Sequence, residues 1–189
     1  MLQSINSVIK NMISEPENKI LRKYVPDEYD QLVQLQICWI LDITGSMSSS
    51  IEACKKASAA AANIISDQGL NVGFVMSTYT EDSKGSYVSY DRFSKVDEAV
   101  KFINSIKLCV PPRFPNVNAS GDDGEENLKL AMADFSSRHN FDIPSVVFII
   151  TDADYHSKGS GSKTAKHEQS ELKKLNIEDD LFKIWSTFD

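Results

Sequence analysis

Residues 35–50, in which an apolar run passes into a hydroxyl-rich loop, read LQICWILDITGSMSSS. Residues 35–41 are almost continuously apolar, which is typical of a strand buried on both faces of a parallel sheet. The run stops at Asp42, and the sequence after the loop predicts a helix whose inward stripe contains Ile51, Cys54, Ser58, Ala61 and Ile65. The stretch as a whole therefore predicts a buried strand, a polar loop and a helix.

The rest of the chain alternates in the same way between β-rich and helical segments. Residues 70–79 and 87–90 predict two strands that form a hairpin at a sheet edge, with a polar turn at residues 81–85. Residues 145–151 contain the run VVFII and predict a second buried strand, which also stops at an aspartate, Asp152. The remaining predicted elements are helices over residues 96–106, 125–139 and 170–175, and a last strand over residues 181–185.

This order of elements predicts a three-layer α/β fold. We expect a mostly parallel central sheet with one antiparallel edge strand, and helices on both faces of it. Ligands of such sheets bind at the carboxyl ends of the strands. Because Asp42 and Asp152 each follow a buried strand, we expect both carboxylates at that edge.

The chain length of 189 residues suits one domain with a short extension. Residues 1–30 carry two groups of apolar residues at helical spacing, separated at Pro16, and are interpreted as an amphipathic N-terminal arm. This arm would pack on the domain or bind a partner. Residues 31–189 then form the domain itself.

Charge and cysteine usage exclude several classes of protein. The net charge of -7 disfavours non-specific binding to nucleic acid or to anionic membranes, so neither is an expected partner. The longest apolar runs are far shorter than a membrane span, so we expect no membrane insertion. The first residues do not resemble a signal peptide, and the scattered cysteines suit buried thiols in a reducing compartment, so we expect a cytoplasmic protein.

The loop after the first strand carries hard oxygen donors at close spacing. Asp42, Thr44 and Ser46 follow one another at every second position, and Gly45 allows a tight turn between the hydroxyl groups. Such donors suit Mg²⁺, Mn²⁺ or Ca²⁺ rather than zinc. Asp152 is expected to add a carboxylate, and residues 121–125, GDDGE, a third arm. The alternative is a helix N-cap with adjacent hydroxyls.

Three motifs together resemble a known family. Residues 40–48, ILDITGSMS, are similar to the D-x-[ST]-x-S signature of von Willebrand factor type A domains. Residues 120–126, SGDDGEE, and residues 151–156, TDADYH, resemble the G-G-D-x-P-E and T-D-A-P-x-H segments of a subset of that family. This subset includes the domains attached to alpha-type kinases and hemicentin-like proteins. The resemblance covers about residues 35–188 and implies a three-layer Rossmann-like fold.

The resemblance implies a metal-ion-dependent adhesion site. Its ligands in this chain would be Asp42, Thr44, Ser46 and Asp152, and the expected cofactor is Mg²⁺, with Mn²⁺ or Ca²⁺ as alternatives. The family's middle-loop threonine has no counterpart here, so Asp123 is expected to take its place, with Asp122 as second choice. A further carboxylate would weaken the pull of the ion on a partner's acid and would favour Ca²⁺.

The function implied is that of a non-enzymatic protein–protein interaction module. A partner protein would supply an Asp or Glu to the open position of the ion. One alternative is a structural subunit of a larger assembly, in which the metal only stabilises the loops. A haloacid-dehalogenase-type phosphatase fits less well, because it needs a second acid where Thr44 stands.

Three further residues near these motifs receive ordinary interpretations. His156 is read as a surface or hydrogen-bonded histidine, because sites for hard cations rarely use imidazole. Glu125 and Glu126 are read as residues of the first turn of a helix, where negative charge is favourable.

Overall fold

The computed structural model describes residues 33–66, 71–121, 124–157 and 160–186, so the predicted arm over residues 1–30 lies outside the described residues. The described part is an α/β fold around a mixed four-stranded sheet in the order β3-β2-β1-β5. Its strands are β1 (Leu35–Asp42), β2 (Val72–Asp82), β3 (Gly85–Phe93) and β5 (Ser145–Ile150). β1 pairs in parallel with β2 and β5, and β2 pairs antiparallel with β3. The predicted mostly parallel sheet with one antiparallel edge strand is confirmed.

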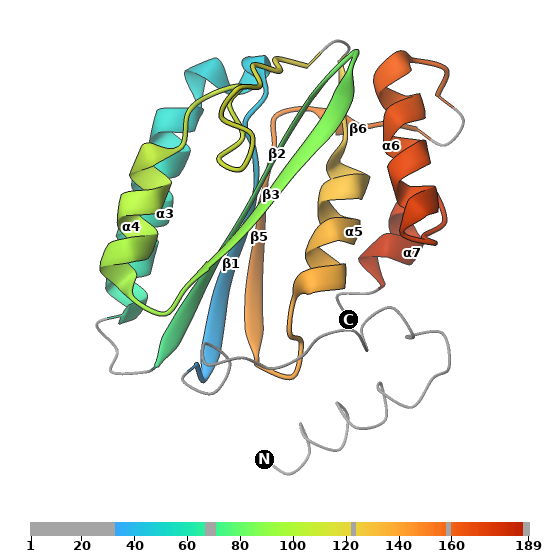
Figure 1. Cartoon of the computed structure of the whole chain (residues 1–189). Coiled ribbons are helices and arrows are strands. Elements are labelled where there is room, and N and C mark those ends of the chain that lie inside the picture. The colour runs from blue at the N-terminus through green and yellow to red at the C-terminus, as the bar shows by residue number, and fades with distance from the viewer. Residues whose placement is uncertain (1–32, 67–70, 122–123, 158–159, 187–189) are drawn as a thin grey trace.

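Helices cover both faces of this sheet (Figure 1). Alternate residues of β1 point to opposite faces, as the two-residue period of a strand requires. Ile37, Trp39 and Leu41 pack in one apolar cluster with α3 (Ile51–Ser66) and α4 (Val96–Ser105). Cys38 and Ile40 pack in the other with α5 (Leu128–Arg138), α6 (Lys163–Lys174) and α7 (Leu181–Trp185). A strand apolar on both faces was therefore the correct prediction for residues 35–41.

The helix predicted over residues 125–139 begins only at Leu128. Glu125–Glu126 instead form a short strand, β4, which pairs in parallel with β6 (Asp154–Tyr155). The interpretation of both glutamates as first-turn helix residues was wrong, because their backbone pairs with a segment almost thirty residues away. This second, two-stranded sheet joins the loop before α5 to the loop after β5.

The strand predicted over residues 181–185 is also wrong, since this segment is the helix α7. A short apolar run does not by itself distinguish a strand from a helical turn. Here Ile184 is buried in the α5-side cluster, while Trp185 is 51 % exposed. The amide of Ile184 donates to the carbonyl of Asp180 at 3.0 Å, which is helical pairing.

The start of one other helix moves by several residues. α6 begins seven residues before the predicted start, at Lys163, and the hydroxyl of Ser162 caps it by accepting a hydrogen bond from the Ala165 amide at 3.0 Å.

The three cysteines are all described, and none forms a disulfide. Within the described ranges, every helix is too short or too polar to cross a membrane.

Candidate functional site

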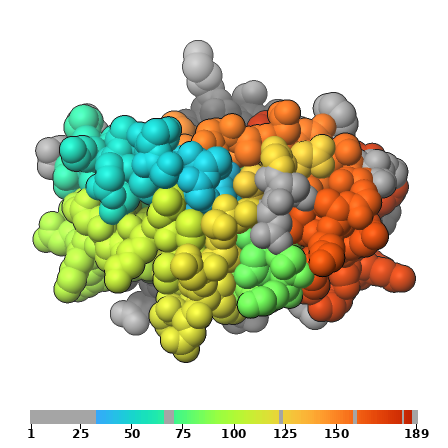
Figure 2. All heavy atoms as spheres, turned by 90° about the horizontal axis from the view of Figure 1, so that it is seen from above, coloured from blue at the N-terminus to red at the C-terminus, as the bar shows by residue number. Residues whose placement is uncertain are grey.

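The sheet topology brings the ends of β1 and β5 together. The two strands run side by side with Leu41 opposite Ile150, so the residues that follow them emerge at the same edge. After β1 the chain forms the 3₁₀ helix η2 (Gly45–Ser49). Figure 2 looks onto this end of the molecule, where the loop after β1 (cyan) lies beside the loop after α4 (yellow).

A continuous chain of oxygen contacts links four predicted site residues. Oδ1 of Asp42 accepts hydrogen bonds from the amide of Thr44 at 2.8 Å and from its hydroxyl at 2.7 Å. The Thr44 hydroxyl lies 3.0 Å from the hydroxyl of Ser46. That of Ser46 donates in turn to Oδ1 of Asp152 at 2.8 Å. The structure therefore brings together Asp42, Thr44, Ser46 and Asp152, which lie up to 110 residues apart in sequence.

Two hydroxyl groups stand between the two carboxylates. The Thr44 hydroxyl donates to Asp42, and the Ser46 hydroxyl donates to Asp152. The two hydroxyl oxygens lie 3.0 Å apart, and either of them could donate to the other. The four side chains therefore bring together oxygen atoms of the kind that hard cations bind.

The chain of contacts runs from the interior to the surface. Asp42 and Thr44 are fully buried, whereas Ser46 and Asp152 are exposed. The outer end is therefore the side from which solvent or a partner can approach.

Two residues that the sequence analysis missed complete the surroundings of Asp42. Its Oδ2 accepts hydrogen bonds from the hydroxyl of Thr151 at 2.9 Å and from that of Tyr79 at 3.4 Å. Tyr79 lies opposite Asp42 in the parallel β1–β2 register, which only the strand pairing reveals. Thr151 stands beside Asp152 in the TDADYH motif, so its position in the motif was a usable signal.

The electrostatics of Asp42 follow from this burial. Loss of solvent raises the pKa of Asp42, and the hydrogen bonds from Thr44 and Thr151 only partly oppose that rise. The negative charge of Asp152 raises the pKa further. Burial, followed by the charge of Asp42, raises the pKa of Tyr79 as well. The centre thus holds negative charge that nearby hydroxyl groups stabilise only in part.

The middle loop contributes through its backbone. Asp123, the predicted third ligand, and Asp122, its alternative, lie outside the described residues. The described residues before them contact the site loops: the Gly45 amide donates to the carbonyl of Ser120 at 2.8 Å. Gly121 has a φ of +84°, and a Cβ there would stand 2.9 Å from Oε1 of Glu126. Glycine is therefore strongly favoured at position 121.

Glu126 is a third acid near the centre. It is 2 % exposed. Its negative charge, added to that of Asp42, raises the pKa of both Tyr79 and Cys109, although burial is the larger cause for each. The sequence did not indicate this role, because Glu126 was interpreted as a residue of the first turn of a helix.

No protein-family model and no curated protein matches this chain. The resemblance to von Willebrand factor type A domains therefore depends on the three motifs quoted above. In the part of the chain that the structure describes, His, Cys, Asp and Glu form no group of three placed to hold a metal ion. The centre described here is of another composition, two carboxylates and two hydroxyls.

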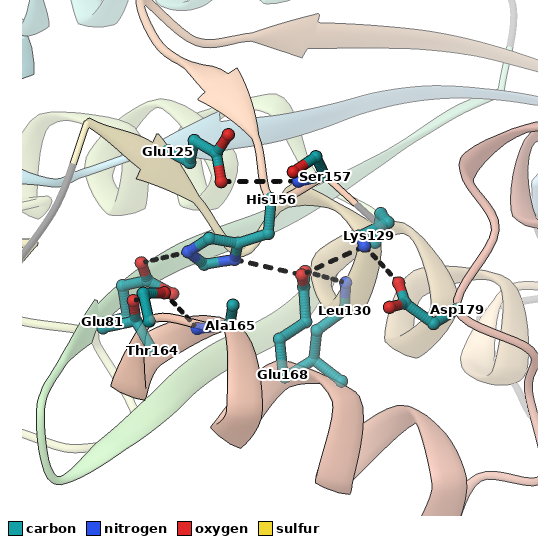
Figure 3. Close-up of polar contacts among 11 residues, drawn as sticks. Glu81, Glu125, Lys129, Leu130, His156, Ser157, Thr164, Ala165, Glu168 and Asp179 are labelled. Atoms are coloured by element: carbon teal, nitrogen blue, oxygen red, sulfur yellow. Dashed lines mark hydrogen bonds and ion pairs between the residues drawn. The ribbon is translucent and has the colours of Figure 1, made fainter. Parts of the chain in front are cut away.

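His156 lies behind the centre rather than in it. Its ring is fully buried, with Nε2 3.2 Å from Oε1 of Glu81 and Nδ1 3.1 Å from Oε2 of Glu168 (Figure 3). The reading of His156 as a hydrogen-bonded residue is confirmed, while a surface position is wrong. No pattern in the sequence indicated its two acidic partners, which come from β2 and α6.

Proposed function

We propose that the chain is a von Willebrand factor type A domain that acts as a non-enzymatic protein–protein interaction module. A divalent cation held by Asp42, Thr44, Ser46 and Asp152 would bind a carboxylate of a partner protein. The order of the strands and the helices on both sheet faces support a three-layer, Rossmann-like arrangement of this kind. The three unpaired cysteines support a reducing compartment, and we propose the cytoplasm.

The observation that carries the proposal is the cluster of four oxygen-bearing side chains from the loops after β1 and β5. The hydroxyls of Thr44 and Ser46 lie 3.0 Å apart, between the carboxylates of Asp42 and Asp152. Carboxylate and hydroxyl oxygens are the donors that Mg²⁺ and Ca²⁺ prefer, so the residues present fit such an ion. A bound cation would supply positive charge between Asp42 and Asp152 and an attachment point for an outside acid.

The exposed end of the centre supports a role in partner binding. Ser46 and Asp152 are open to solvent, and Mg²⁺ in proteins keeps several water ligands that another oxygen can displace. The alternative, a metal that only stabilises the loops, draws support from the complete burial of Asp42 and Thr44. The two functions differ in whether the ion exchanges its outer ligands.

Titration calorimetry with MgCl₂, MnCl₂ and CaCl₂ tests the proposal. We expect Asp152→Asn and Ser46→Ala to weaken cation binding by about tenfold or more, since each removes an oxygen donor or its orientation. Ser48→Ala is the matched control, because Ser48 is an exposed serine of the same 3₁₀ helix. Equal affinity in all four proteins would contradict a cation site at these residues.

Water relaxation with Mn²⁺ then separates the two functions. An interaction module should enhance proton relaxation through exchanging water on the ion, and acetate or a short glutamate peptide should reduce that enhancement. A loop-stabilising ion with no exchangeable position would give neither effect.

A further inference from the structure

The segment that carries Asp152 is held on both sides. Before it, the hydroxyl of Thr151 donates to Asp42. After it, β6 pairs with β4, and the amide of His156 donates to the carbonyl of Glu126 at 3.3 Å. The position of Asp152 relative to Ser46 therefore depends on how firmly the residues up to His156 are attached to the body of the domain.

The His156 ring makes the side-chain part of this attachment. It bridges Glu81, on β2, and Glu168, on α6, and all three side chains are fully buried (Figure 3). The loop after β5 is thereby joined to a strand and to a helix at once.

Glu168 is itself held in place by α5. Its Oε1 accepts a hydrogen bond from the amide of Leu130 at 2.9 Å, and its Oε2 lies 3.7 Å from Nζ of Lys129. Lys129 is buried and also pairs with Asp179, which precedes α7. The loop is thus connected through His156 to β2, α5 and α6.

The geometry favours a doubly protonated ring. A neutral imidazole has one N–H, so one of the two glutamates would then face a nitrogen lone pair. In the described part of the chain, the acids in contact with the ring are Glu81 and Glu168, and Glu168 also lies 3.7 Å from the buried cation Lys129. A protonated His156 supplies a second positive charge to this acidic cluster.

The pKa of His156 agrees with a doubly protonated ring. Burial alone lowers the pKa of His156, but hydrogen bonds to Glu168 and Glu81 and the negative charges of both outweigh it and raise the pKa to about 10. The ring is therefore a cation at neutral pH.

We propose that His156 is the positioning residue of the cation site: as a buried cation between Glu81 and Glu168, it holds the segment that carries Asp152 in the place where that carboxylate meets Ser46. The expected effect of His156 on metal affinity rests on the proposed function. Its expected effect on the mobility of the segment that carries Asp152 does not depend on a metal. Loss of the ring charge would let the segment move, and cation binding would then have to order it again.

The test compares His156→Gln with Asp134→Asn. Asp134 is the matched control, because it is a buried acid in an ion pair, 2.6 Å from Arg138, on α5 and outside the loop contacts. We expect His156→Gln to weaken Mg²⁺ binding in calorimetry by about tenfold, the usual effect of residues that orient a ligand, and Asp134→Asn to leave it within about twofold. Titrations are made well below the unfolding temperature of each variant. Equal Mg²⁺ affinity in His156→Gln and wild type would overturn the proposal.

Hydrogen exchange of the metal-free proteins provides the independent readout. Amides of residues 151–157 should exchange about tenfold faster in His156→Gln than in Asp134→Asn, because local opening is no longer opposed by the ion pairs. Faster exchange without any cation binding in wild type would leave the positioning role intact and refute the proposed function. Unchanged exchange would refute the positioning role, whatever the metal does.

Two further measurements test the inference if the His156→Gln protein does not fold. Glu81→Gln removes one buried acid and keeps the pair between His156 and Glu168, and we expect it to weaken Mg²⁺ binding measurably, but less than His156→Gln does. NMR of the wild-type ring should show both nitrogens protonated at pH 8. A neutral ring at that pH, or full affinity in Glu81→Gln, would overturn the inference.

Discussion

Two groups of acids lie near the same end of the sheet and differ in what balances their charge. Glu81 and Glu168 face buried cations, His156 and Lys129. In the described part of the chain, the hydrogen bonds to Asp42 and Asp152 come from hydroxyl groups and one backbone amide. The first group is internally neutralised and suits a structural anchor. The second retains negative charge and suits an external cation.

The largest expected effect is a loss of folding stability when the ion pairs of the first group are broken. Lys129→Met leaves Glu168 and Asp179 without their buried lysine, and removal of one partner of a buried ion pair costs about 3–5 kcal/mol. Urea denaturation measures the loss. Lys183→Met is the control, because its pair with Glu178 is exposed and contributes about 0–1 kcal/mol. Equal losses in the two variants would mean that the cluster around His156 is not ion-paired in solution.

The next largest effect is a loss of cation affinity in the second group, Asp42 and Asp152. Asp42→Asn keeps an acceptor for Thr44 but removes the charge that a cation needs, so we expect Mg²⁺ affinity to fall about a hundredfold or more. Burial makes the ionised form of Asp42 costly, but an Asn amide group cannot accept the hydrogen bonds that Oδ2 receives from Thr151 and Tyr79. We therefore expect the stability without metal to change by less than about 1 kcal/mol. Calorimetry and thermal denaturation in EDTA check both statements. An unchanged affinity would reduce the centre to a hydrogen-bonded turn.

The pH dependence of stability sharpens the comparison. The pKa of His156 is raised to about 10 in the folded chain, against an ordinary value of 6.5, so between these values the folded state holds a proton that the unfolded state has lost. Its stabilisation is complete below about pH 6.5 and is lost as the pH rises through 10, by at most about 1.4 kcal/mol per pH unit.

Urea midpoints at pH 6.5, 8 and 9.5 measure this slope. Burial also raises the pKa of Cys109, so other groups contribute in the same range. The difference between wild type and His156→Gln isolates the histidine, and parallel curves for the two proteins would disagree with a buried cation.

The smallest expected effect concerns Gly121, in the loop that contacts the first group. Gly121 has positive φ, and its amide donates to the carbonyl of Glu81 at 2.8 Å. Gly121→Ala should cost about 1–2 kcal/mol in denaturation, because the new Cβ meets the carboxylate of Glu126 in a strained backbone conformation. In Gly124→Ala the new Cβ meets nothing within 4 Å, so a change within about 0.5 kcal/mol is expected. A loss of equal size in both variants would argue against this close approach.

Local patterns were sufficient for the elements at the centre of the fold. The apolar runs before Asp42 and Asp152 predicted both strands, and β1 is buried on both faces as expected. The same expectation was wrong for β5, which lies at the edge of the sheet with Val146 44 % and Phe148 43 % exposed. Parallel pairing of those strands then places both aspartates at one edge. The four predicted residues Asp42, Thr44, Ser46 and Asp152 are in contact for that reason.

Features that depend on contacts between distant segments could not be predicted from the sequence. The pairing of β4 with β6, the helical state of residues 181–185 and the burial of Glu126 come from packing partners far along the chain. His156 shows this best, because a lone histidine carries no sign of the two glutamates that hold it. Periodicity records which residues avoid water, whereas the pairing of buried charges is set by which elements the folded chain brings side by side.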